Sequence, residues 1–385
     1  MKKTLAAVAV LGAFAGSALA ADVQLYGIVD LGLQYVHADK DVANQDATDT
    51  FTMATGGQSG SRFGIKGTED LGNGLEVGFV LENGFDADTG SLGNNGRLFG
   101  RESQAFLRGS FGELSFGRVG QLTSGNGTYG ITGNLSPFGT SWSGVGAVEG
   151  STFMVGYSRT DNTITYKTPS FAGVNVYAQY SSDMNTKLDG MTENKGNSNR
   201  YAALGATYGN GALKLVGVVD WYNWDSSATA AHGIADIDDG YTVTLGGSYD
   251  FEVVKAYLGA QYFDNMLPQT GKDKGVDKDG YGFVSAAGLK QAEGYAVMAG
   301  VDAPVWGGKA MFAVGYAYAE SALNDVEKDA EFTRWGVSAG YDYALSKRTN
   351  LYTVLAYLQD SKEGYTAVDS DPYQIGFTVG LRHKF

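Results

Sequence analysis

The sequence predicts an all-β protein: a 16-stranded antiparallel transmembrane β-barrel whose third long loop folds into the lumen. Three observations predict this fold class. Many stretches of roughly ten residues alternate between apolar and polar side chains, which is the length of a tilted membrane strand. No apolar stretch after residue 20 is long enough for a membrane helix. The connections between the alternating stretches are short and long in turn, as on the two rims of a barrel.

The closing residues 373–385 show the alternation most clearly. Ile375, Phe377 and Val379 belong to a set of positions that is almost wholly apolar, and the intervening positions are polar or glycine. Successive side chains of a strand point to opposite faces, so this strand has one dry face and one wet face. A barrel in an outer membrane requires such a strand, with its apolar face against lipid.

Sixteen stretches of this kind can be counted, and an even number places both chain ends on the short-turn, periplasmic rim. Asn210-Gly211 is the strongest signal for a two-residue hairpin, because both residues tolerate a positive φ. The expected strands span 22–36, 59–69, 73–84, 97–110, 112–119, 152–168, 171–182, 199–209, 212–224, 239–250, 253–265, 291–304, 308–319, 331–344, 348–360 and 372–385.

The first twenty residues are predicted to be a secretory signal peptide. Lys2 and Lys3 precede an apolar stretch, and Ala18-Leu19-Ala20 is a small-x-small cleavage site. The alternative, an N-terminal membrane anchor, would need a longer apolar run. The predicted organisation is therefore a signal peptide at 1–20 and one barrel at 21–385, exported to the outer membrane.

Charge and composition exclude several classes of protein. The formal net charge of −14 becomes −16 without Lys2 and Lys3, which argues against a nucleic-acid-binding protein. The chain has no cysteine, so a disulfide scaffold and thiolate metal sites are excluded. The three histidines lie in separate segments without metal-ligand spacing. We therefore expect no catalytic residues, no metal site, no cofactor and no enzymatic activity.

Most of the surplus acidic residues fall in the predicted long loops, for example Asp39, Asp41, Asp273 and Asp325. Two interpretations stay open. These acids are a solvated rim, or they bind the anions of outer-leaflet lipid and lipopolysaccharide through divalent cations. Asp277-Lys278-Asp279-Gly280 lacks the further acidic positions of a calcium-binding loop.

Three arginines are predicted to point into the barrel. Phe63 and Ile65 alternate with Arg62, and Ile164 and Tyr166 share a stretch with Arg159. Arginine on the lipid face at mid-depth costs about 2–4 kcal/mol, which favours the inward orientation. Arg101 lies in a stretch with poorer alternation and is assigned inward as well. The alternative is that each arginine pairs with a carboxylate and only braces the wall.

The third long loop, roughly 120–150, differs from the others in composition. It contains Pro137, Phe138 and Trp142, and it has no Asp, Glu, Lys or Arg from Gly120 to Val148. A loop without the acidic residues of the other loops is expected in a different place, inside the barrel, where it narrows the pore. The alternative is a neutral external loop.

Several motifs, in this order and spacing, resemble the Gram-negative general-diffusion porins of the neisserial and comamonad type. The resemblance covers essentially the whole chain after residue 20. The motifs are Leu25-Tyr26-Gly27, Ser61-Arg62-Phe63-Gly64-Ile65-Lys66-Gly67, Phe111-Gly112, Phe116-Gly117-Arg118, Asp161-Asn162-Thr163-Ile164-Thr165-Tyr166 and Gly380-Leu381-Arg382-His383-Lys384-Phe385.

The resemblance implies a sixteen-stranded homotrimeric barrel with the third loop as an eyelet opposite a basic cluster. Arg62, Arg101 and Arg159 match the cluster positions, and Phe385 matches the signal that the barrel assembly machinery recognises. Two departures stand out. Ile28 occupies a position that is basic in enteric relatives, and the third loop lacks their acidic residues.

The function expected from these observations is a water-filled channel for passive diffusion of small hydrophilic solutes and ions. An arginine cluster that faces a loop without carboxylates predicts a preference for anions. Two alternatives remain: a cation-preferring porin dominated by its acidic loops, and an adhesin-type surface barrel with little conductance. A soluble secreted β-protein is a third, more distant reading.

Overall fold

The computed structural model describes residues 22–139, 154–156, 158–184, 198–224, 237–267, 287–323, 330–364 and 369–385. These residues form one antiparallel sheet and two short 3₁₀ helices, η1 (Asn94–Gly96) and η2 (Thr132–Asn134). Within the described part of the chain, no helix is both long enough and apolar enough to cross a membrane. The strands are β1 (Asp22–Asp39), β2 (Thr48–Thr55), β3 (Arg62–Gly72), β4 (Leu75–Gly84), β5 (Glu102–Gly109), β6 (Gly112–Gly120), β7 (Arg159–Lys167), β8 (Val174–Ser181), β9 (Arg200–Asn210), β10 (Leu213–Asn223), β11 (Gly240–Asp250), β12 (Lys255–Met266), β13 (Ala292–Val305), β14 (Gly308–Ser321), β15 (Glu331–Ala344), β16 (Thr349–Glu363) and β17 (Tyr373–Lys384).

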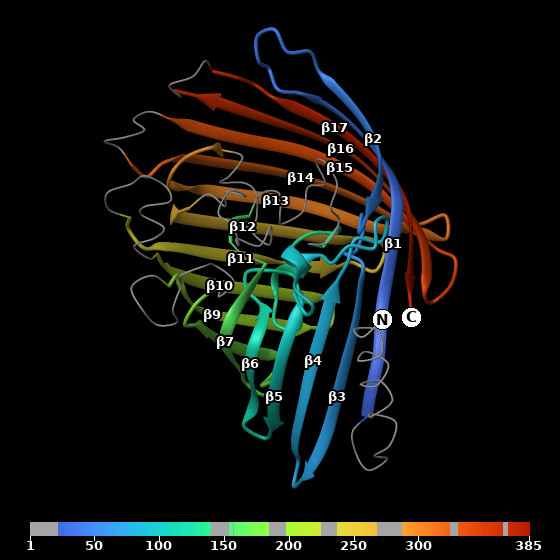
Figure 1. The fold of residues 1–385 in the computed structure, drawn as a ribbon, viewed down its shortest axis with the longest axis vertical. Helices are drawn as coiled ribbons and strands as arrows, with labels where there is room; N and C mark the ends of the chain where they lie inside the picture. Colours follow the sequence, from blue (N-terminus) through green and yellow to red (C-terminus); the bar gives the residue numbers. More distant parts are fainter. Residues whose placement is uncertain are drawn as a thin grey trace, which may run out of the picture.

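The sheet closes into a barrel because its first and last strands pair. Ile28 to Asp39 of β1 lie in antiparallel register with β17, and the two strands run side by side in Figure 1. On its other edge β1 pairs first with β3 and then with β2. β2 and β3 thus share one position around the wall, so the seventeen strands fill sixteen positions. The structure therefore confirms the predicted sixteen-stranded barrel.

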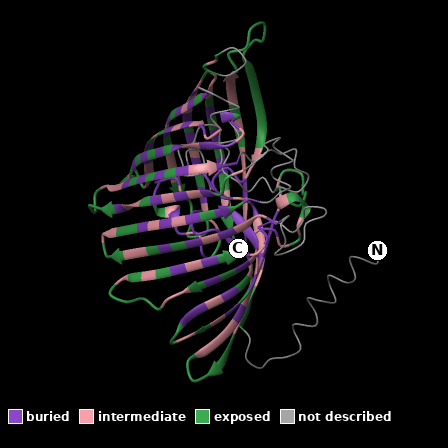
Figure 2. Ribbon diagram, turned by 90° about the vertical axis from the view of Figure 1, so that its left-hand side faces the viewer, coloured by how far each residue is buried: buried purple, intermediate pink, exposed green. Residues whose placement is uncertain are grey.

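The predicted alternation appears as stripes of buried and exposed residues along the strands (Figure 2). On β17, Phe377, Val379 and Leu381 are exposed on the outside, whereas Thr378 and Gly380 are buried on the inside. The barrel interior is therefore the packed side, and the exposed apolar side chains form its outer surface. This arrangement is the one expected where the outer face meets lipid.

Short turns gather on one rim and long connections on the other, as the sequence predicts. The turn between β9 and β10 is Gly211-Ala212, one residue later than expected, because Asn210 still pairs with Leu213. Gly211 has φ +57°, a conformation that favours glycine. Trp306 and Gly307 form the equally short turn between β13 and β14.

The first long loop differs from the expectation of an irregular connection at 37–58. β1 and β2 continue as a paired hairpin through this segment. The strand pairing is interrupted only afterwards, at residues 56–61, where the chain leaves the sheet. Asp30 stabilises this irregular segment. Its carboxylate accepts hydrogen bonds from the backbone N–H of Gln58 (3.0 Å) and Ser59 (2.7 Å) and from the Tyr352 hydroxyl (2.6 Å).

The described part of the third loop, residues 121–139, packs against the inward-facing, buried side of the wall. Leu135 contacts the wall at Gly246 and Gly259. Glycines further along the wall accommodate the next residues, with Pro137 seated at Gly300 and Phe138 at Gly340. Residues 135–138 of the loop therefore follow β11, β12, β13 and β15, whereas Thr128 and Tyr129 lie against β5 and β6. Trp142, the third predicted eyelet residue, lies outside the described residues.

Carboxylates of the wall anchor the same loop by accepting hydrogen bonds from its donors. Glu102 accepts from the backbone N–H of Thr128 (2.7 Å), and Glu113 accepts from the Tyr129 hydroxyl (2.7 Å). Burial raises the pKa of Tyr129, which keeps this hydroxyl protonated and able to donate. The fully buried Asp220 accepts from the Thr123 hydroxyl.

Deletion of Phe385 should lower the unfolding temperature of the barrel. Its backbone exchanges hydrogen bonds with Gly27 (3.0 and 3.1 Å), and its ring covers the position that a Gly27 side chain would occupy. Removing it shortens the pairing at the closing seam. The measurement is the temperature at which the compact band in detergent is lost on electrophoresis. Phe171→Ala is the control, because Phe171 is 83% exposed in a turn; an unchanged midpoint after the deletion would contradict this role.

Gly340→Leu should displace Phe138 and speed hydrogen exchange in the third loop. A Cβ atom at residue 340 would lie 2.6 Å from the Phe138 ring, so the larger side chain cannot coexist with the seated ring. Exchange of residues 131–139, followed by mass spectrometry, is the measurement. Gly209→Leu is the matched control, because nothing lies within 4 Å of a Cβ atom there. Equal exchange in both variants would show that the loop does not depend on this seat.

Candidate pore constriction

Two of the predicted arginines share one carboxylate on the inner wall. Glu82, at the buried end of β4, lies 2.7 Å from Nε of Arg101 and 3.8 Å from a guanidinium nitrogen of Arg62. The Tyr26 hydroxyl donates a third contact to Glu82 at 3.0 Å. This group draws on β1, β3, β4 and the residue just before β5, which the barrel register brings together.

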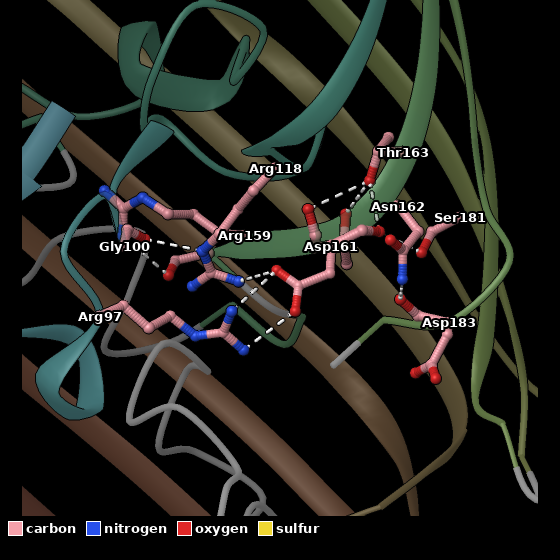
Figure 3. A network of polar contacts seen from close by, with 11 residues as sticks. Arg97, Gly100, Arg118, Arg159, Asp161, Asn162, Thr163, Ser181 and Asp183 are labelled. Atoms are coloured by element: carbon pink, nitrogen blue, oxygen red, sulfur yellow. Dashed lines mark hydrogen bonds and ion pairs between the residues drawn. The ribbon is translucent and has the colours of Figure 1, made fainter. Parts of the chain in front are cut away.

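A second carboxylate, Asp161 of β7, holds two arginines that the sequence prediction did not include (Figure 3). Arg97 approaches Asp161 at 2.9 Å and Arg118 at 2.8 Å, and all three side chains are largely buried. Buried ion pairs of this kind are costly to break, because removing one partner leaves an uncompensated charge. Asp161 therefore fixes the positions of both guanidinium groups.

Arg159 lies at the start of β7, close enough to Arg62 for their positive charges to repel each other. Only 6% of Arg159 is exposed. Arg159 and Arg101 line a cavity of about 270 Å³ together with Asn94, Asn126 and Asp86. The three predicted arginines are thus brought into one region of the wall.

The constriction cluster, as we define it, has more positive than negative groups. Its five arginines face three carboxylates, and Asp86 in the adjoining cavity does not reverse the excess. Glu102, the third carboxylate, already accepts two hydrogen bonds from Thr128 of the third loop. The described part of that loop contributes no charged side chain. The members are Arg62, Arg97, Arg101, Arg118, Arg159, Glu82, Glu102 and Asp161.

The alternative that the arginines brace the wall is partly right. Arg62 and Arg101 make ion pairs with Glu82, so both contribute to the wall. Arg101 also lines the cavity, which shows that bracing and lining are compatible. Arg101 reaches inward because it precedes β5; the alternation within β5 itself places Glu102 on the inner side.

Sequence reasoning missed Arg118 for a definite structural reason. Outward Phe116 predicts that Arg118 also points outward, but a β-bulge shifts the register between Gly117 and Val119. Gly117 has φ +136°, and a side chain there would meet the Ser103 carbonyl oxygen at 2.1 Å. Glycine at this position is therefore required, and a glycine inside an alternating stretch is the available signal for a bulge.

No group of three or more histidine, aspartate or glutamate residues in the described ranges is placed to hold a metal ion. The constriction cluster instead combines guanidinium groups with carboxylates and amides. Guanidinium groups can bind anions through charge and hydrogen bonds.

Comparisons with known proteins agree with this geometry. Residues 6–363 match the Gram-negative porin family. The chain is 36% identical to an outer membrane porin protein of Bordetella pertussis and 32% identical to outer membrane porin protein 32 of Delftia acidovorans, in both cases over the full length of both proteins. Among solved structures, an anion-selective porin from Comamonas acidovorans shares 26% identity and superposes with a TM-score of 0.62, covering 95% of this chain and all of that one.

The predicted resemblance is confirmed by matches that span nearly the whole chain. The chain therefore belongs to the Gram-negative porin family and forms an outer-membrane channel for small hydrophilic solutes.

Proposed function

We propose that this porin prefers anions and that the constriction cluster sets the preference. The observation that carries the proposal is the excess of five arginines over three carboxylates within the constriction cluster. Glu102 is moreover engaged by Thr128 of a loop that carries no charge from Gly120 to Val148. The local field in the lumen beside the constriction cluster is then positive.

The acidic external loops favour the opposite preference, but they act from farther away. Charges exposed on a rim are screened over about 8 Å at physiological salt, whereas a narrow, low-dielectric passage focuses the field. The similarity to a porin described as anion-selective supports the same conclusion. The cation-preferring alternative would require the loop acids to dominate despite this screening.

The same proposal includes the partners predicted from the sequence. Three copies form a homotrimer through their apolar outer faces, outer-membrane lipid and lipopolysaccharide contact the remaining surface, and the barrel assembly machinery recognises Phe385. The signal peptide is removed after Ala20. No catalytic role is proposed, because the fold and family indicate a channel rather than an enzyme.

Reversal potential in a KCl gradient across a planar bilayer tests the preference directly. We expect an anion-selective channel, because the constriction lowers the entry cost for chloride. Replacing Arg62, Arg101 and Arg159 with alanine should shift the selectivity toward cations. Arg108→Ala is the control, since Arg108 is likewise paired with carboxylates but is half-exposed and lies outside the constriction cluster.

Three outcomes would contradict the proposal. A cation-selective wild-type channel would favour the alternative in which the acidic loops dominate. A normal folded yield with little conductance would favour the adhesin-type alternative. Unchanged selectivity in the triple variant would show that the three arginines only brace the wall.

Glu82→Gln should raise the anion preference, because it removes a negative charge that two arginines share. Glutamine keeps the size of the side chain and can still accept the Tyr26 hydrogen bond. The measurement is again the reversal potential. Glu76→Gln, on the same strand but paired with the half-exposed Arg108 near the short-turn rim, serves as control. A shift of the selectivity toward cations in Glu82→Gln would contradict the assignment of Glu82 to the constriction.

A further inference from the structure

A second positively charged site lies at the periplasmic rim, away from the constriction cluster. It is a pocket of about 310 Å³ between the turn before β14, the turn before β16 and the end of β17. Its lining includes five cationic residues and one carboxylate. We call it the vestibule pocket, and its charged residues are Lys309, Lys347, Arg348, Arg382, Lys384 and Asp342.

The one carboxylate of the vestibule pocket forms no ion pair with these cations and leaves them in excess. Asp342 accepts hydrogen bonds from the side-chain amides of Gln58 (2.6 Å) and Asn350 (2.8 Å). Lys309 lies 3.8 Å from Asp302, outside the lining. Among the described residues, no carboxylate lies within ion-pair distance of the other four cations.

Neutral partners orient the most enclosed of these cations. Arg382 donates to Asn350 Oδ1 (3.0 Å) through its Nε and to Ser59 Oγ (2.9 Å) through one terminal nitrogen. Asp30 is close enough to interact electrostatically with Arg382 but makes no ion pair with it, so the guanidinium has further N–H groups to offer. Such a preorganised fork suits the oxygens of a phosphate or carboxylate.

Like charges also lie next to each other across two strands. The register places Arg382 opposite Asn350, and the Lys384 backbone N–H donates to the Arg348 carbonyl at 2.8 Å. Arg348 and Lys384 are therefore neighbours at the end of the β16–β17 pair. Like charges in such positions destabilise a sheet, and an anion between them offsets the repulsion.

We propose that the vestibule pocket is an anion-binding subsite for a phosphate group. Arg382 and Lys384 occupy inward positions of β17, so a solute in the lumen reaches the pocket. A doubly charged oxyanion matches several converging cations better than chloride does. The inference rests on the assignment of the chain as a channel and not on the selectivity of the constriction.

Calorimetric titration of the detergent-solubilised full barrel with inorganic phosphate, in a chloride buffer at pH 8, tests the proposal. The double variant Arg348→Gln/Lys384→Gln should bind phosphate at least about tenfold more weakly, because two charged donors are lost. Arg382 stays intact to preserve its contacts with Ser59 and Asn350. The matched control is Lys214→Gln/Lys255→Gln, which removes two positive charges near the same rim outside the pocket.

Equal weakening in both double variants would overturn the proposal, because the effect would then be a general loss of rim charge. Absence of phosphate binding to the wild type, or unchanged binding in the pocket variant, would overturn it as well. Competition by dihexanoyl phosphatidylglycerol would identify a lipid headgroup as the source of the phosphate, and no competition would identify a soluble solute. The reversal potential in KCl should still indicate an anion-selective channel in the pocket variant. A cation-selective wild type that still binds phosphate in this pocket would refute only the proposed selectivity.

Discussion

Backbone hydrogen bonding in a medium without water is the constraint on which the rest of this structure depends. Lipid cannot satisfy exposed N–H and C=O groups, so a chain that crosses it with strands must leave no open edge. The pairing of β1 with β17 meets this requirement, and Phe385 extends it to Gly27. Closure then divides every strand into an apolar outer face and an inner face whose composition can serve transport.

The inner face uses carboxylates in an unexpected way. Glu102, Glu113 and Asp220 belong to the wall, and each accepts a hydrogen bond from the third loop. The loop can therefore be anchored with hydroxyl and amide donors and without charged residues of its own. The absence of acidic residues from the third loop thus has a physical explanation. Because the loop adds no carboxylate of its own, the arginines remain in excess in the constriction cluster.

Much of the fold follows from the sequence because alternation reports directly on which face a residue occupies. The prediction succeeds for β17, where the period of two is unbroken. It fails where the backbone leaves that period. The bulge between β6 and β7, together with the positive φ of Gly117, turns Arg118 inward, and the irregular segment 56–61 lets β2 and β3 share one position. Arg97 lies in irregular chain, and its pairing with Asp161, 64 residues away, depends on barrel register that a single sequence does not specify.

The central claim is that the lumen beside the third loop is electropositive, and thiol chemistry can measure this locally because the chain has no cysteine. Asn126 lines the cavity with Arg101 and Arg159, whereas Ala43 is exposed in the β1–β2 hairpin connection. Asn126→Cys and Ala43→Cys would each be modified with anionic and cationic methanethiosulfonate reagents of similar size. After normalisation to residue 43, we predict that the anionic reagent is favoured at residue 126 by roughly tenfold, as a potential of about one kT or more implies. A normalised ratio of one, or a preference for the cationic reagent, would contradict the account.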